Sequence, residues 1–318
     1  MSESFPELVA QALARPSQDT LTALLDALPA VDSSRIASEV DSAVHAVHDD
    51  TSLSHLVDTA LALTDLTTLE GTDTPSRVRA LVARAQHPDP EDDSAPHTAG
   101  VCVYGDLAAV VREALGVDSP IELACVAGAF PSGRASIEVK LADVRYALRQ
   151  GATEIDMVID RGAFSDARYL TVFEDVRRIV EVCRDAEHAV RVKAILETGE
   201  LPGSDAVQQA SWLAMLAGAD MIKTSTGKIP RAATLPDVAI MLDAAWDFEQ
   251  VTGRPIGVKA AGGIRSAQDA VHYLSLVQQK AGDAGLVPQR FRFGASSLVA
   301  NLVDARHQLA AGADPFGE

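Results

Sequence analysis

The chain has 318 residues, of which 47% are hydrophobic and 4% aromatic, and its formal net charge is −18 at pH 7. This length and hydrophobic content are enough for one large domain such as an α/β barrel. Nucleic-acid binding requires positive charge, so we expect no nucleic-acid partner. We find no basic and apolar leader in the first twenty residues and no apolar run long enough to span a bilayer. We therefore expect no membrane association and a cytoplasmic location.

The first part of the chain, residues 1–55, is acidic and rich in alanine and leucine. Its apolar residues recur at helical spacing, and Pro16 and Pro29 interrupt the pattern. We predict an N-terminal extension of about three helices, without visible chemistry, followed by a barrel domain over residues 56–318.

The remainder of the chain alternates between short apolar runs and amphipathic segments. The predicted strands are Asp65–Leu69, Gly100–Tyr104, Leu123–Ala127, Glu154–Ile159, Arg191–Thr198, Met221–Thr226, Ile256–Ala261 and Phe291–Ala295. The predicted helices are Pro75–Ala85, Leu107–Leu115, Ile137–Arg149, Leu170–Arg184, Asp205–Ala217, Leu235–Phe248, Ala267–Gln279 and Leu298–Leu309. Eight such repeats predict a (β/α)8, or TIM, barrel. A doubly wound open sheet is the alternative.

The lysines have an unusual distribution. Only six of the 27 basic residues are lysines, and Lys193, Lys223 and Lys259 fall inside predicted strands, while Lys228 closely follows one. Arginine stays protonated, whereas a desolvated lysine can lose its proton and become a nucleophile. This distribution favours lysine chemistry at the strands.

Side-chain alternation predicts where these lysines point. If the apolar neighbours face the outer helices, Asp156, Lys193, Lys223 and Lys259 converge on the barrel axis. Three lysines around one aspartate leave at least one lysine without a counter-ion. Burial and a nearby cation both lower a lysine's pKa, which favours an amine that attacks a carbonyl to form a Schiff base. A purely structural ion network is the alternative.

Glycine-bearing turns follow the last three predicted strands. They are Thr226–Lys228, Ala261–Arg265 and Gly294–Ser297. Glycine allows backbone N–H groups to approach an anion, and phosphate sites after strands seven and eight recur in this fold. The three turns together predict a phosphate site.

Several segments carry a family resemblance. Asp65–Leu69 (DLTTL), Val192–Leu201 (VKAILETGEL), Ile222–Lys228 (IKTSTGK), Val258–Arg265 (VKAAGGIR) and Phe293–Ser297 (FGASS) resemble the deoxyribose-phosphate aldolase family. The resemblance implies a (β/α)8 barrel and a class I aldol reaction without a cofactor. In that reaction 2-deoxy-D-ribose 5-phosphate is split reversibly into acetaldehyde and D-glyceraldehyde 3-phosphate, as part of deoxyribonucleotide catabolism and carbohydrate metabolism.

The resemblance also implies roles for the inward-facing residues. Lys223 would form the Schiff base, and Lys259 would be the neighbouring cation that keeps it neutral. Asp156 would move protons through water, and Lys193 would be an auxiliary charge beside it.

The resemblance further implies a set of binding residues and a dimer. The 5-phosphate would be held by Gly227, Lys228, Gly262, Gly263, Ser296 and Ser297. Thr67 and Cys102 would line the substrate channel, and a homodimer is common in the family. The chain departs from the family's longer bacterial members because it ends at Pro315–Glu318 without a terminal tyrosine. Phe316 could cover the site but could not relay a proton.

Other functions remain open from the residues alone. A metal-dependent aldolase would need histidine ligands, but the eight histidines all lie outside the predicted strands, so we expect no metal. The three cysteines lack metal-ligand spacing, and we expect them to be reduced and buried. Another lysine-dependent phosphosugar aldolase, such as a transaldolase, and a non-catalytic phosphosugar-binding barrel are the alternatives.

Overall fold

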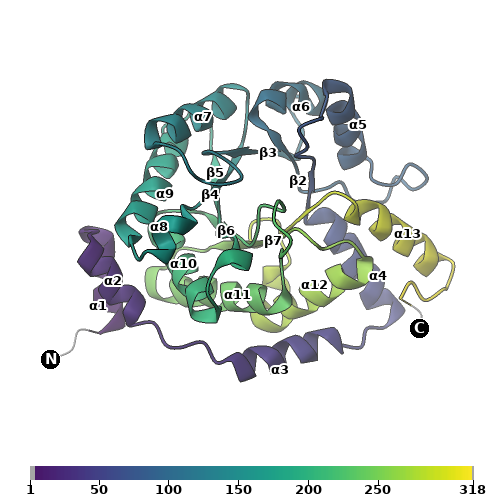
Figure 1. Cartoon of the computed structure of the whole chain (residues 1–318). Coiled ribbons are helices and arrows are strands. Elements are labelled where there is room, and N and C mark those ends of the chain that lie inside the picture. The colour runs from purple at the N-terminus through teal and green to yellow at the C-terminus, as the bar shows by residue number, and fades with distance from the viewer. Residues whose placement is uncertain (1–3, 317–318) are drawn as a thin grey trace.

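The computed structural model describes residues 4–316, which contain eight parallel strands closed into a barrel (Figure 1). The strands are β1 Thr64–Thr67, β2 Gly100–Tyr104, β3 Glu122–Ala127, β4 Glu154–Val158, β5 Arg191–Ile195, β6 Met221–Lys223, β7 Gly257–Ala261 and β8 Phe291–Ala295. Each strand pairs with the next, and β1 also pairs with β8, with Asp65 opposite Gly294. The predicted (β/α)8 barrel is confirmed, and the open sheet is wrong because the first and last strands pair.

Helices follow the strands and surround the barrel. They are α5 Pro75–Gln86, α6 Ala108–Leu115, α7 Ile137–Arg149, α8 Arg161–Ser165, α9 Tyr169–Arg184, α10 Ser204–Leu216, α11 Leu235–Thr252, α12 Ala267–Ala281 and α13 Leu298–Ala310. Local signals set several of their starts, since Thr74, Thr234 and Ser266 each accept a hydrogen bond from a backbone N–H in the first turn. The short α8 has no counterpart among the predicted helices.

Two strands end three residues before their predicted ends. We expected strand five to reach Thr198, but it ends at Ile195, and Glu197 then takes a left-handed conformation with φ of 55°. We expected strand six to reach Thr226, but it ends at Lys223. Beyond it the Thr224 hydroxyl accepts a hydrogen bond from the Ala261 N–H at 3.0 Å, so a side chain replaces the strand ladder there.

The N-terminal section forms four helices where about three were predicted. They are α1 Phe5–Ala14, α2 Gln18–Asp26, α3 Ser33–Val44 and α4 Asp50–Ala62. Asp49 caps the start of α4, whose buried face, including Leu56 and Leu61, packs against α12 and α13. The expected boundary between residues 55 and 56 therefore falls inside a helix. Figure 1 shows α1 and α2 beside α9 and α10, and α3 beside α11 and α12.

The strands divide their side chains between two environments. Apolar residues such as Ile155, Val192, Ile222 and Val258 are at most 1% exposed and belong to the core between barrel and helices. The opposite face of the same strands carries charged residues toward the axis.

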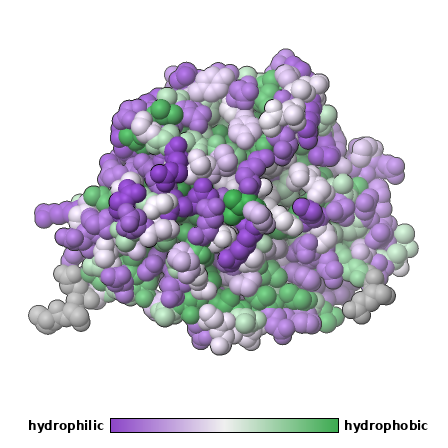
Figure 2. Space-filling view, in the orientation of Figure 1, coloured by the Kyte–Doolittle hydropathy of each residue, from purple (hydrophilic) through white to green (hydrophobic). Residues whose placement is uncertain are grey.

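Hydrophilic residues cover much of the molecular surface shown in Figure 2. Within residues 4–316, we find no helix with the length and apolar character to cross a membrane.

Candidate active site

A cluster of charged side chains fills the middle of the barrel. Lys223 Nζ lies 2.7 Å from Asp156 Oδ2, and Lys259 Nζ lies 2.9 Å from the same oxygen. Lys193 Nζ lies 2.9 Å from the other oxygen, Oδ1. All four residues are at most 3% exposed. The structure thus brings together, from β4, β5, β6 and β7, the four residues that alternation placed on the axis.

Three further charged residues belong to this cluster. Asp65 on β1 accepts a hydrogen bond from Lys259 Nζ at 2.5 Å, and its other oxygen binds Arg292 of β8. Glu154 on β4 binds Lys193, and its Oε1 atom lies 3.3 Å from Arg292 Nη2. The three lysines do share Asp156, but Asp156 is not their only counter-ion. Glu154 precedes it by two residues on the same strand, and barrel closure adds Asp65 together with Arg292.

The charge balance still leaves one amine in excess. Three buried carboxylates face four buried basic groups, which are Lys193, Lys223, Lys259 and Arg292. The partly exposed Arg191 also binds Glu154, and it is shared with Glu122. A buried charge without a partner is strongly disfavoured, so the basic group with the weakest compensation is the one expected to lose its proton.

The pKa directions identify that group as Lys223. Burial has the largest influence on the Lys223 pKa and lowers it, and the nearby cation Lys259 lowers it further. Asp156 raises the pKa, but by less, so the Lys223 pKa lies below its usual value. Burial also disfavours the charged form of Lys259, but Asp156 and Asp65 outweigh it and raise the Lys259 pKa. Lys259 therefore stays cationic next to an amine that can be neutral.

Asp156 remains ionised within this cluster. Burial would raise its pKa, but Lys193, Lys223 and Lys259 together hold the pKa well below the usual value for an aspartate. An ionised carboxylate in contact with both Lys223 and Lys259 can accept and return protons at either amine.

A cavity of about 370 Å³ opens above Lys223 at the carboxyl ends of the strands. The residues predicted for the substrate that line it are Thr67, Gly227, Lys228, Gly262, Gly263, Ser296 and Ser297. Gly262 and Gly263 have φ of 81° and 83°, a conformation that glycine adopts readily. The cavity is thus lined both by the Lys223 amine and by a socket of glycine, serine and lysine residues, which are Gly227, Lys228, Gly262, Gly263, Ser296 and Ser297.

Cys102 is placed differently from our expectation. It is fully buried in a small apolar cluster with Leu69, Ala124 and Val126, and it is not among the residues that line the cavity. Burial raises the pKa of its thiol. Its side chain on β2 packs inside the barrel, where the charges of Asp156 and Lys259 also act on the pKa of its thiol.

Glu197 is a buried residue of the site that sequence reasoning missed. Its carboxylate accepts hydrogen bonds from the Thr226 N–H at 3.1 Å and from the Thr226 hydroxyl at 2.6 Å. The Thr226 hydroxyl in turn accepts from the Lys228 N–H at 3.1 Å, and Arg161 lies 3.3 Å from the carboxylate. Glu197 therefore fixes the turn that carries Lys228. The left-handed backbone conformation of Glu197 is strained for a non-glycine residue, but a single sequence does not reveal this strain.

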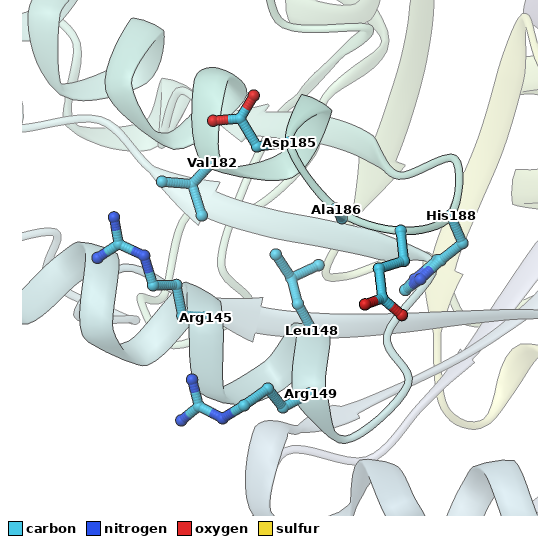
Figure 3. Close-up of a pocket in the computed structure, with 8 residues that line it drawn as sticks. Arg145, Leu148, Arg149, Val182, Asp185, Ala186 and His188 are labelled. Carbon is cyan, nitrogen blue, oxygen red and sulfur yellow. The ribbon is translucent and has the colours of Figure 1, made fainter.

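Two other cavities lie apart from these residues. One, of about 530 Å³, is lined by α7, α9 and the loop before β5, with Arg145 and Leu148 on one side and Val182 and Asp185 on the other (Figure 3). These helix ends lie where the strands begin, at the opposite end of the barrel from the cavity above Lys223. Phe316 lines another cavity, with Ser266 and Asn301, and does not cover Lys223.

The comparisons with known proteins agree with this geometry. Residues 59–295 match the DeoC/LacD family aldolase. The chain is 40% identical over 252 residues to the human deoxyribose-phosphate aldolase, covering 76% of this chain and 78% of that protein. It is 41% identical over 254 residues to the Bos taurus deoxyribose-phosphate aldolase, with 76% and 78% covered.

A solved structure shares the fold. It is the tetrameric deoxyribose phosphate aldolase from Aeropyrum pernix, with a TM-score of 0.61 and 24% identity, covering 86% of this chain and 98% of that one. The barrel and its lysine-centred site thus define an aldolase. The chain belongs to the DeoC/LacD aldolase family.

Proposed function

We propose that the chain is a class I aldolase that reversibly cleaves 2-deoxy-D-ribose 5-phosphate to acetaldehyde and D-glyceraldehyde 3-phosphate through a Schiff base on Lys223. The observation that carries this proposal is the position of Lys223, a buried amine of lowered pKa facing a cavity, with the cation Lys259 on the same carboxylate oxygen. The names of the human and bovine relatives support the choice of substrate.

The first steps use the amine and the carboxylate. Neutral Lys223 attacks carbon 1 of the open-chain sugar, and one proton taken up from solvent lets the carbinolamine hydroxyl leave as water, which gives the iminium ion. The carbinolamine itself forms when a proton passes from the lysine nitrogen to the former carbonyl oxygen. Asp156, 2.7 Å from Lys223 Nζ, is placed to take and return this proton.

The later steps break and reprotonate carbon. The hydroxyl on carbon 3 loses its proton, the bond between carbons 2 and 3 breaks, and the electron pair passes to the iminium nitrogen as an enamine. Glyceraldehyde 3-phosphate leaves. Protonation of carbon 2 and hydrolysis of the imine then release acetaldehyde and restore the amine. Asp156 and Lys259 are the groups placed to move these protons through water.

The socket at the other end would hold the 5-phosphate. Lys228 would supply a positive charge, and Gly262, Gly263, Ser296 and Ser297 would supply N–H and hydroxyl donors. The reaction would place the protein in deoxyribonucleotide catabolism in the cytoplasm. We further propose a homodimer, while the Aeropyrum pernix protein named above is a tetramer.

Trapping tests the proposed chemistry. The full chain is treated with acetaldehyde and borohydride, and peptide mass spectrometry locates the reduced adduct. We expect a two-carbon adduct on Lys223 that is absent from the Lys223→Arg variant. An adduct that forms only with longer ketose donors would favour a transaldolase. If no adduct forms but the protein still binds phosphate, a non-catalytic sugar-binding barrel would be favoured.

A further inference from the structure

The loop between β1 and α5 carries two carboxylates, Glu70 and Asp73, that bind cations lining the cavity. Glu70 Oε1 lies 3.1 Å from Lys228 Nζ, and Asp73 Oδ1 lies 3.3 Å from Arg77 Nε. Glu70, Arg77 and Lys228 all line the cavity that contains Lys223. Two of the three cations that line this part of the cavity, Arg77 and Lys228, therefore already have a carboxylate partner from the protein, and Arg265 is the third.

The two carboxylates differ in how firmly the surrounding structure holds them. The Asp73 side chain is 2% exposed, accepts hydrogen bonds from the Thr68 hydroxyl at 2.8 Å and the Glu70 N–H at 2.9 Å, and so fixes the loop backbone. The Glu70 side chain is 59% exposed, and its contact with Lys228 bridges 158 residues of sequence. Glu70 can leave Lys228 without disturbing the loop that carries it.

We propose that Glu70 competes with the substrate's phosphate for Lys228 and thereby sets the preference between phosphorylated and unphosphorylated sugars. A phosphate within reach of Lys228 would lie beside the Glu70 carboxylate, and like charges at such separations repel. With an unphosphorylated sugar, Glu70 keeps Lys228 paired. This inference rests on the proposed function only in assigning the phosphate to this end of the cavity.

The expected change in phosphate affinity follows from the solvent exposure of the Glu70 side chain. Solvent-exposed ion pairs contribute about 0–1 kcal/mol, which corresponds to at most about a fivefold change in affinity. Removing the competing charge should therefore tighten phosphate binding by about two- to fivefold. The effect should shrink as ionic strength rises, because salt screens exposed charges.

Calorimetric titration of the full chain with inorganic phosphate tests the proposal. We expect a two- to fivefold lower Kd for Glu70→Gln than for the native protein. Glu113→Gln removes the same charge from another exposed glutamate, 76% exposed and 3.8 Å from Arg79, outside the cavity. It should leave the Kd unchanged. In the Lys228→Gln background, Glu70→Gln should give a smaller gain in affinity, because only the direct repulsion between Glu70 and the phosphate is then removed.

An unchanged or weakened affinity for phosphate in Glu70→Gln would overturn the proposal, as would an equal gain in Glu113→Gln. The titration needs no aldol chemistry, so its outcome is independent of acetaldehyde trapping on Lys223. As a second measurement, Glu70→Gln should lower KM for deoxyribose 5-phosphate relative to KM for deoxyribose. Equal changes for the two sugars would also count against the competition.

Discussion

Lys223 and Lys259 share one carboxylate oxygen, since their Nζ atoms lie 2.7 and 2.9 Å from Oδ2 of Asp156. The two lysines are opposite each other on adjacent strands, but only Lys259 has a second carboxylate, Asp65, at 2.5 Å. This difference in partners explains why burial lowers the pKa of one lysine while the other stays charged.

Replacing Lys259 tests this relationship. In Lys259→Met the nearby cation is gone, so the Lys223 pKa should rise and the limb of the kcat/KM profile that reports its deprotonation should move to higher pH. Activity at pH 7 should fall, because less of the amine is neutral. A profile that keeps its shape and position would contradict the role given to Lys259.

Lys140→Met is the matched control for this variant. Lys140 is 1% exposed and lies 2.5 Å from Asp175 between α7 and α9, outside the barrel axis. Breaking a buried ion pair costs about 3–5 kcal/mol of stability, so both variants should unfold at lower urea concentration. Only Lys259→Met should shift the pH profile.

The serines of the phosphate socket offer a substrate-dependent test. Charge-assisted hydrogen bonds contribute about 1.5–3 kcal/mol each, so replacing Ser296 and Ser297 by alanine should raise KM for deoxyribose 5-phosphate by at least about tenfold. KM for unphosphorylated deoxyribose should change little. Steady-state kinetics with both sugars decide this, and equal increases would argue against a phosphate at Ser296 and Ser297.

Glu197 should act on binding through the turn after β6. Glu197→Ala leaves the Thr226 N–H and hydroxyl without their partner, and a buried unpaired polar group costs about 1–3 kcal/mol. The turn carrying Lys228 should loosen, raising KM for the phosphorylated sugar about tenfold or more while trapping on Lys223 persists. Glu200→Ala is the control, because Glu200 also binds Arg161, at 2.9 Å, but is 46% exposed. A similar KM for the phosphorylated sugar in both variants would contradict the proposal that Glu197 fixes the turn carrying Lys228.

The buried carboxylates predict a stability difference that depends on pH. The Asp65 pKa is lowered in the folded protein because Lys259, Arg292 and Lys193 together outweigh the opposing effect of burial. An unfolded aspartate has a pKa of about 3.9, so the stabilisation is complete above that pH and is lost as pH falls toward the lower folded-state value. The difference in Tm between native protein and Asp65→Asn should therefore be largest near neutral pH and shrink below about pH 4. A difference that stays constant across pH 2.5 to 7 would show that Asp65 does not stabilise the fold as an ionised group.

The sequence by itself determined the elements and one face of the site. A period of two along the strands separated apolar residues such as Ile222 from charged ones such as Lys223, because one face must be buried against helices. The glycine-bearing turns likewise marked the residues that line the cavity, including Gly262 and Gly263. These features depend on local spacing, which a sequence displays directly.

Only the tertiary structure decided which charges meet. Asp65 and Arg292 are 227 positions apart and become partners because β1 pairs with β8 to close the barrel. That closure supplied Asp65, a counter-ion of Lys259 that local alternation could not count, and it left Lys223 as the amine with the least compensation. The contact between Glu70 and Lys228 likewise exists because loops that follow distant strands end at the same rim. Electrostatic balance depends on distances between all the charges together, and those distances are properties of the closed barrel.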